Sequence, residues 1–465
     1  MGLSIGLDTA VKALRAHQVA VDTAAHNIAN ANTPGFSRQR VLLRPIGIDG
    51  SDHFGRDSLL GRVGFGVDAH DVNRVRDIFM DFQARQAISN HAQFDSQATA
   101  LGRAELAFNE PSDDGLAVVF NQFWNGFQDL ANDPESSAAR TSIANAAITL
   151  AGRLRRSSTD LSSQRADVDR QVAGTGDTIN AAAGEIAALN FQVKQVELAG
   201  DRANDLRDRR DLALDNLSRV VGISYVEQQD KTVTVYIGSH ELVSGNMAQQ
   251  VAAIPDTANP GNTAIVFAAD QEPVAAASGE LRGLLDVRDT QLPGVVAKLN
   301  TLTAAFITQL NTLHATGFGL DNTTGLPFFT GTNASDIDVN PLLISNPEKI
   351  GAASVMSAAG DGSHALALAD LRHALTMATG TQTFEQYYTN TVGVLGADIN
   401  RAKGLAQSGD LLEKHIDGLR QSVQGVNIDE EVVSLTQSQK AYQAAAHVIS
   451  VIDSMLDTLI NRTGA

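Results

Sequence analysis

The sequence predicts a mainly α-helical protein: a long helical bundle with coiled-coil helices at its two ends and a small β-rich insert. Three observations support this fold class. Apolar residues recur every seven residues at each end of the chain, as they do in coiled coils. Long tracts between the ends carry apolar residues at helical spacing. Only the segment 221–277 is rich in short runs that alternate with a period of two.

The C-terminal stretch has the clearest pattern. Its seven-residue line consists of Ile428, Leu435, Tyr442, Ile449 and Leu456, and a second line three residues later consists of Ala445, Ile452 and Leu459. Asn427 stands where a helix would begin, and Glu430 follows at the spacing of a capping box. We therefore expect a well-defined helix that presents one narrow apolar stripe.

The N-terminal stretch repeats this pattern. One line consists of Leu7, Leu14, Val21 and Ile28, and the other of Leu3, Ala10, His17 and Ala24. Either helix alone could pack on the core of its own domain. Two matching stripes favour a coiled coil, because a globular domain rarely needs a narrow stripe at each end. The segments 1–36 and 425–465 are therefore predicted to form one terminal assembly domain.

Composition excludes several classes of protein. The 465 residues carry a net charge of −18 with the acidic residues dispersed, so a nucleic-acid partner or an anionic membrane partner is not expected. Cysteine is absent, which excludes disulfides and thiolate metal sites. The N-terminal pattern contains charged residues, so it is not a cleaved secretory signal, and no run is long enough to span a membrane.

A sharp turn should follow the first helix. Thr33 precedes a proline and is disfavoured in a helix, while Pro34 and Gly35 suit the central positions of a type II turn, with Gly35 at positive φ. The residues from Phe36 onward alternate and should be extended. We define the signature turn as Asn32, Thr33, Pro34, Gly35, Phe36, Ser37, Arg38 and Gln39.

The run from Ala25 to Gln39, AHNIANANTPGFSRQ, resembles the N-terminal signature of bacterial flagellar axial proteins. Rod and hook proteins share it as far as Phe36 but typically continue with lysine. The Ser37-Arg38-Gln39 continuation is similar to that of the type 1 hook-associated proteins, which begin the hook–filament junction. Further similar runs follow in family order: Asn109-Glu110-Pro111, Asp133-Pro134, 204–210, 278–286, Leu326-Pro327-Phe328-Phe329 and 425–431.

The middle of the chain should form a helical core from residues 37–220 and 278–424, interrupted by the β-rich insert 221–277 with a hairpin turn near Asp230. Trp124 should anchor this core. The segment 317–362 has Gly, Asn, Asp and Pro punctuation and is predicted to be an irregular, exposed excursion. The alternating charges of 204–211 predict an exposed, salt-bridged helix face.

The remaining segments are predicted to be loop or helix. Residues 46–66 should be a loop, and helices should begin near Ser112 and at Asp133-Pro134. Helix is also expected over 365–377 and 384–423, where Leu405, Leu412 and Leu419 again recur every seven residues.

Catalytic and metal-binding patterns are incomplete. Gly2 to Gly6 fits G-x-S-x-G but has no strand before it, and His240-Glu241 lacks the second histidine of a zinc helix. No cofactor is therefore expected. The competing class is a secreted enzyme or binding domain on a helical stalk, which would need a convergent polar cluster in 221–277 or 317–362.

The resemblance implies a structural subunit of the extracellular flagellum, exported by the flagellar type III pathway and joined to hook and filament by self-assembly of its terminal helices. The implied partners are further copies of the chain, the hook protein, the second hook–filament junction protein and an export chaperone on the C-terminal helix. Another axial component of hook or rod type is the alternative within the flagellum. Larger members of the family carry outer β-domains after the position of Phe329. Here the chain returns to helix within about forty residues, so the resemblance does not extend to an outer-domain function.

Overall fold

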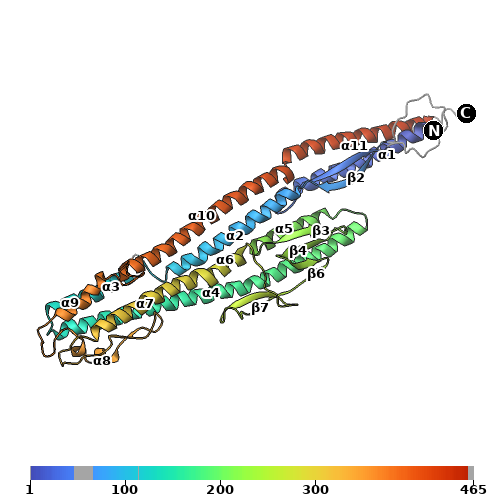
Figure 1. The fold of residues 1–465 in the computed structure, drawn as a ribbon. Coiled ribbons are helices and arrows are strands. Elements are labelled where there is room, and N and C mark those ends of the chain that lie inside the picture. The colour runs from blue at the N-terminus through green and yellow to red at the C-terminus, as the bar shows by residue number, and fades with distance from the viewer. Residues whose placement is uncertain (1, 47–65, 111, 114, 459–465) are drawn as a thin grey trace. The chain divides into compact units, whose positions relative to one another are not determined.

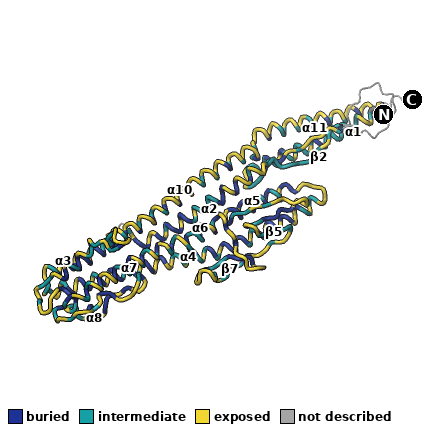
Figure 2. The backbone as a smooth tube through the Cα atoms, in the orientation of Figure 1, coloured by how far each residue is buried: buried dark blue, intermediate teal, exposed yellow. Residues whose placement is uncertain are grey.

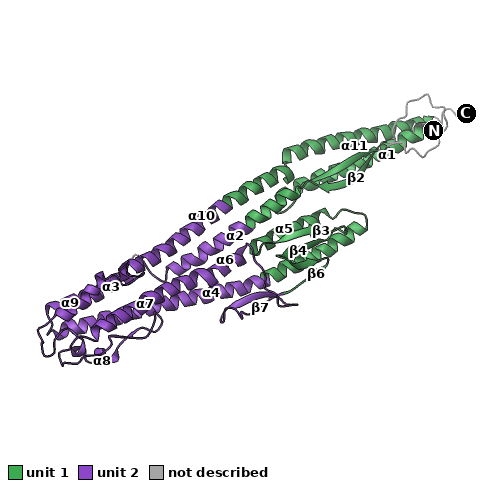
Figure 3. Cartoon of the chain, viewed as in Figure 1, with its two compact units in different colours: residues 1–88, 178–250, 410–465 green, residues 89–177, 251–409 purple. Residues whose placement is uncertain are grey.

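The computed structural model describes residues 2–46, 66–110, 112–113 and 115–458, which are mainly helical (Figure 1). The chain divides into two compact units (Figure 3). Unit 1 comprises residues 1–88, 178–250 and 410–465, and unit 2 comprises residues 89–177 and 251–409. Three helices contribute to both units: α2 (Ile78–Glu105), α4 (Ser137–Leu198) and α10 (Phe384–Gln424). The predicted terminal, core and insert domains have other boundaries than these two units. That division of the chain stays a prediction.

The two ends of the chain pair in unit 1. Helix α1 (Gly2–Ala29) packs along α11 (Ile428–Asp457), and Figure 1 shows the start of α1 beside the end of α11. A Cβ atom on Gly6 would lie 3.3 Å from Ile452 Cδ1, while Asn27 hydrogen-bonds Glu431. The helices are therefore antiparallel. The antiparallel strands β1 (Gln39–Pro45) and β2 (Val67–Arg74) also pack on α1.

Unit 1 also contains α5 (Asn204–Val220) and a four-stranded antiparallel sheet in the order β3-β4-β5-β6. Its strands are β3 (Ser224–Glu227), β4 (Val233–Ile237), β5 (His240–Ser244) and β6 (Met247–Ala248). The predicted hairpin is confirmed, because β3 and β4 pair across the turn at Asp230. The remaining strands of the insert, β7 (Val251–Pro255) and β8 (Thr263–Phe267), form an antiparallel pair in unit 2.

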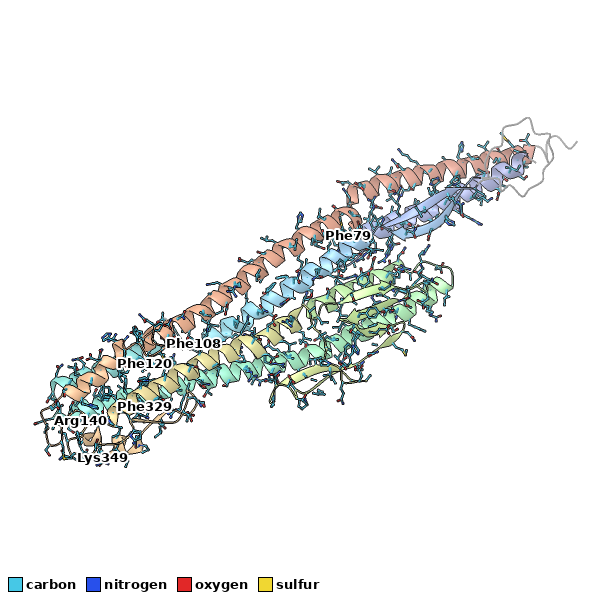
Figure 4. All side chains as sticks on the ribbon, in the orientation of Figure 1. Phe79, Phe108, Phe120, Arg140, Phe329 and Lys349 are labelled. Carbon is cyan, nitrogen blue, oxygen red and sulfur yellow. The ribbon has the colours of Figure 1, made fainter. Side chains whose placement is uncertain are left out.

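Unit 2 is built around an aromatic cluster. Its helices include α3 (Leu116–Asn132), α6 (Glu280–Asp286), α7 (Leu292–His314) and α9 (Ser363–Asp370), and a π-helical turn (Val287–Gln291) joins α6 to α7. Trp124 is buried against Phe123 and Phe306, with ring centroids 5.1 and 5.6 Å away, which confirms its predicted core position. Figure 4 labels two further members of the cluster, Phe120 and Phe329.

The segment 317–362 is not the exposed excursion that the sequence predicts. It contains short elements, β9 (Phe329–Thr330), β10 (Asp338–Val339), α8 (Pro341–Ser345) and a 3-10 turn (Pro347–Lys349). Phe328, Phe329, Ile337 and Leu343 are fully buried. The polar punctuation concealed these apolar anchors, because they fall in runs of one to three apolar residues between turn residues, and runs this short show no period.

Several predicted helix boundaries also change. The tracts between Asp133 and Leu198 form one 62-residue helix, α4, rather than several helices. Helix α3 begins after Gly115 rather than near Ser112. Helix α9 ends at Asp370, so the predicted helix over 365–377 is too long. The predicted loop 46–66 lies outside the described residues except at its ends, where the Ile46 amide donates to the Gly66 carbonyl.

His314 is the last residue of α7, and its two hydrogen bonds hold the imidazole ring in a single protonation state. Its Nδ1 lies 2.8 Å from the Leu326 carbonyl oxygen, and its Nε2 accepts a hydrogen bond from the Gly351 amide at 3.0 Å. Only the neutral ring with the proton on Nδ1 satisfies both contacts. Burial lowers the pKa of His314 to about 4, although the Leu326 carbonyl acts in the opposite direction.

This histidine predicts a loss of stability in mild acid. The unfolded chain takes up a proton near the ordinary pKa of 6.5, whereas the folded chain does not do so until about 4. The contribution of His314 to the free energy of unfolding is therefore complete above pH 6.5 and decreases as the pH falls toward 4. Urea unfolding should show a loss of about 2 kcal/mol from this group between pH 7 and pH 5. His314→Gln should remove that part of the pH dependence; an unchanged pH profile would contradict the assignment.

Candidate assembly site

The predicted heptad residues of the two ends meet in one apolar line, which we call the terminal seam. On α1, Ala10 and Ala24 are buried and Leu7, Leu14, Val21 and Ile28 are partly buried. On α11, Ala445 and Ile452 are buried and Leu435, Tyr442, Ile449 and Leu456 are partly buried. Ile428 is the exception, being half exposed, and Leu459 lies outside the described residues. The 3–4 spacing of these positions is that of a coiled coil formed within one chain.

The signature turn has the predicted conformation. Gly35 has φ +78°, and the Phe36 amide donates to the Thr33 carbonyl at 3.1 Å, which closes the turn. A Cβ atom on Gly35 would lie 3.2 Å from Leu212 Cβ on α5, so the turn also approaches its neighbour closely. Asn32, Thr33 and Pro34 are exposed.

The residues after the turn join it to the seam through a set of hydrogen bonds that we call the polar knot. Asn27 Nδ2 donates to Gln39 O at 2.8 Å and to Glu431 Oε2 at 3.0 Å, and the Gln39 amide donates back to Asn27 Oδ1 at 2.9 Å. Arg38 donates to Glu431 Oε1 at 2.7 Å and to Glu430 Oε2 at 2.9 Å. The knot thereby fixes the end of α1, the start of β1 and the first turn of α11 relative to one another.

The start of α11 has the predicted Asn427 cap: the Asn427 side chain accepts hydrogen bonds from the amides of Asp429 and Glu430. The Glu430 half of the predicted capping box differs, because the Glu430 carboxylate bonds Arg38 instead. The α10 helix ends at Gln424, and its carbonyl oxygen accepts a hydrogen bond from the Arg38 amide at 2.8 Å. The break between α10 and α11 is therefore tied to the signature turn.

A second anchor lies on α5, where Asp208, Asp211 and Asp215 form one row that we call the aspartate row. Four arginines pair with these residues and with Asp81 at nitrogen–oxygen distances of 2.7–3.7 Å: Arg74, Arg76, Arg85 and Arg420. The amide of Ser37 also donates to Asp208 Oδ2 at 2.9 Å. The signature turn is thus bonded to the same row.

Burial and charge pairing act in opposite directions on the pKa values in this row. Burial alone would raise the pKa of Asp211, but Arg76, Arg74 and Arg85 lower it well below its usual range. Burial alone would likewise lower the pKa of Arg76, but Asp211 and Asp81 raise it above its usual range. For Asp208 burial prevails and raises the pKa. Asp211 is therefore ionised at neutral pH and depends on its arginines.

The predicted exposed charge face of 204–211 is therefore wrong in part. Asp205 and Arg209 are exposed, but Asp208 and Arg210 are buried. The spacing of three and four residues between Asp208, Asp211 and Asp215 places them on one face of the helix, and it is the sequence signal that could have indicated the row. The alternation of positive and negative residues along the sequence concealed the aspartate row.

Among the residues that the structure describes, no group of three or more His, Asp or Glu side chains could hold a metal ion. Within the same residues, no helix is long and apolar enough to cross a membrane.

The polar knot predicts unequal roles for two adjacent glutamates. The Glu431 side chain is 4% exposed and bonds two partners, whereas that of Glu430 is 59% exposed. Glu431→Gln should lower the free energy of unfolding by about 2 kcal/mol, because a buried charge-assisted bond is lost. The matched variant Glu430→Gln should change it by less than about 0.5 kcal/mol. Urea unfolding of both variants measures the difference, and equal effects would refute the role of the knot.

The turn gives a second prediction. Gly35→Val should destabilise the chain by at least about 1 kcal/mol, because a β-branched residue is strained at positive φ and would crowd Leu212. Gly35→Asn is the control, since asparagine tolerates this conformation better. Urea unfolding should show a lower midpoint for Gly35→Val than for Gly35→Asn. Equal midpoints would show that the positive φ of Gly35 does not constrain the turn.

Comparison with known proteins places this architecture in a family. Residues 101–329 match the helical domain of the flagellar hook-associated protein FlgK, residues 7–36 the flagella basal body rod protein family and residues 421–462 the C-terminal region of the basal body rod proteins FlgEFG. The chain is 30% identical to flagellar hook-associated protein 1 of Bacillus subtilis, over 99% of this chain and 98% of that protein. It is 24% identical to the protein of the same name from Escherichia coli, over 98% and 99% of the two chains.

A solved structure shares the fold. The flagellar hook junction protein FlgK from Burkholderia pseudomallei superposes with a TM-score of 0.65 at 17% identity, covering 74% of this chain and 100% of that one. The chain therefore belongs to the flagellar hook-associated protein 1 family and is a structural component of the flagellum rather than an enzyme.

Proposed function

We propose that the paired terminal helices are the part of this subunit that builds the hook–filament junction. The observation that carries the proposal is the terminal seam, which joins the two ends of the chain and is locked to the signature turn by the polar knot. A rod formed by α1 and α11 presents a long surface to neighbouring copies. Unit 2 contributes no residue to the seam.

The junction role rather than a rod or hook role is favoured by Ser37. Rod and hook proteins typically have lysine directly after Phe36, which is the position of Ser37. Ser37 is fully buried, its amide donates to Asp208, and its Oγ accepts a hydrogen bond from Arg76 at 3.2 Å. A lysine here would place a second buried cation beside Arg76, so these contacts fit the continuation that resembles hook-associated proteins.

The partners follow from this placement. One face of the assembled ring meets the hook protein, and the other meets the second junction protein toward the filament. The subunit is exported through the flagellar type III pathway to the outside of the cell. An export chaperone covers the apolar side of α11 until α1 can pair with it, because each large apolar side chain left in water forgoes about 1.5–3 kcal/mol.

A variant of the seam tests the proposal. Replacing Leu435, Ile449 and Leu456 together by serine should separate α11 from α1 and stop filament growth, while unit 2 stays folded. The control replaces three exposed polar residues of the same helix, Lys440, Gln443 and Asp453, by serine. Each variant is expressed in a strain that lacks its own copy of the gene, export is confirmed, and filaments are examined by electron microscopy. Normal filaments on an exported seam variant would overturn the proposal.

A further inference from the structure

The four-stranded sheet of unit 1 has a free edge. Strand β3 is the end strand in the order β3-β4-β5-β6, and most of it is exposed (Figure 2). Val233 of β4 lies opposite Glu227 of β3, but both of its main-chain groups bond Asn190: the amide donates to Oδ1 at 2.9 Å, and the carbonyl oxygen accepts from Nδ2 at 2.8 Å. Because bonded and non-bonded pairs alternate in an antiparallel ladder, the main-chain groups of Glu227 and Tyr225 both point away from β4. Strand β3 therefore presents N–H and C=O groups to a further strand.

A pocket of about 840 Å³ lies beside this edge, and all of its lining residues belong to unit 1. Tyr225 and Glu227 line the pocket, together with residues of β2, α2 and α5. Three apolar residues from the start of α2 also line it: Ile78, Phe79 and Phe82 are 72%, 67% and 52% exposed, and Figure 4 labels Phe79. The pocket thus offers apolar surface to the side chains of a segment that lies along β3.

The lining of the pocket is positive, although the chain as a whole carries a net charge of −18. Its carboxylates are those of Asp81, Asp211 and Glu227. Its arginines outnumber them: Arg74, Arg76, Arg202, Arg207 and Arg210. A concave surface lined by an excess of cations concentrates the field and favours an anionic ligand.

Arg210 is the pocket arginine that has no carboxylate partner among the described residues. Its guanidinium is buried, and Nη1 donates to Asn190 Oδ1 at 3.0 Å and to Lys231 O at 2.8 Å, while Nε has no partner within the same residues. Burial lowers the pKa of Arg210 to about 10, although Asp211 acts in the opposite direction, so the group stays charged at neutral pH. A buried cation that is not neutralised attracts a carboxylate more strongly than an exposed one.

We propose that the free edge of β3 binds an extended acidic segment of a partner protein as an added strand. The main chain of that segment pairs with the outward groups of Tyr225 and Glu227. Since side chains alternate along a strand, every second side chain of the segment faces the pocket. A carboxylate at one of these positions meets the arginines, and an apolar side chain at another meets Phe79 and Phe82. The contact goes beyond the proposed function, because the terminal seam and the polar knot take no part in it.

A peptide probe tests the proposal with the full-length chain. The probe is a short fluorescein-labelled peptide with threonine at every second position and with glutamate and leucine in turn at the positions between. Fluorescence polarisation should show binding, and replacing the glutamates of the probe by lysine should weaken it by at least about tenfold, because charge-assisted bonds are lost. Equal binding of the lysine peptide would overturn the charge complementarity. Displacement of the probe by free glutamate, at the concentration at which unlabelled peptide displaces half of it, would overturn the strand pairing.

Two substitutions at one position test the main-chain contact. Glu227→Pro and Glu227→Ala both lose the carboxylate and its 3.2 Å contact with Arg207, but only proline lacks the N–H that points away from β4. Proline is tolerated at such a position of an edge strand, and equal urea midpoints would confirm that both variants are folded. Glu227→Pro should bind the probe at least about tenfold more weakly than Glu227→Ala. Equal affinities of the two folded variants would overturn the proposal.

The apolar contact has a test that does not alter β3. Phe79→Ser should weaken binding of the probe by about tenfold, because the ring is exposed in the free chain and would be covered by the bound segment. The control is Leu106→Ser, which removes an equally exposed apolar side chain outside the pocket and should leave the affinity unchanged. The same affinity in both variants would contradict the proposed position of the segment. None of these substitutions touches the terminal seam, so failure of the peptide to bind would leave the junction role standing.

Discussion

Carboxylates buried beside one another repel, so Asp208, Asp211 and Asp215 can share one face of α5 only if cations neutralise them. The cations come from distant parts of the chain. Arg74 ends β2, Arg76 follows it, Arg85 lies on α2 and Arg420 lies on α10. Satisfying the charge of one helix therefore requires four segments to converge.

The register of the terminal seam depends on the polar knot and, through it, on the aspartate row. Apolar heptads alone specify a stripe but tolerate a shift of seven residues, because Leu, Val, Ile and Ala pack similarly in each repeat. The polar knot removes this ambiguity. Asn27 and Glu431 are buried, and each would lose its partners if α11 moved along α1 by a turn. Since the knot is joined to the aspartate row through Ser37, the position of the seam follows from the position of α5.

The parts of the structure that were predictable from sequence are those with a local period or a defined turn geometry. The seam lines, the Asn427 cap, the positive φ of Gly35 and the β3–β4 hairpin each depend on residues close together in sequence. The aspartate row was not recognised, because its partners lie up to 205 residues away and pairing does not leave a period. Short apolar runs such as Phe328-Phe329 were missed because they also leave no period. The continuous length of α4 was concealed by Gly and Ser residues that packing tolerates.

The antiparallel pairing of the first and last helices has a consequence for how the chain is made. Asn27 and Glu431 are 404 residues apart in sequence, so their contact waits until almost the whole polypeptide exists. Closing a loop of this length costs only slightly more entropy than closing a short one, but it sets the order of events. A polypeptide interrupted anywhere before α11 carries an unmatched α1. Truncated products therefore cannot form the terminal seam.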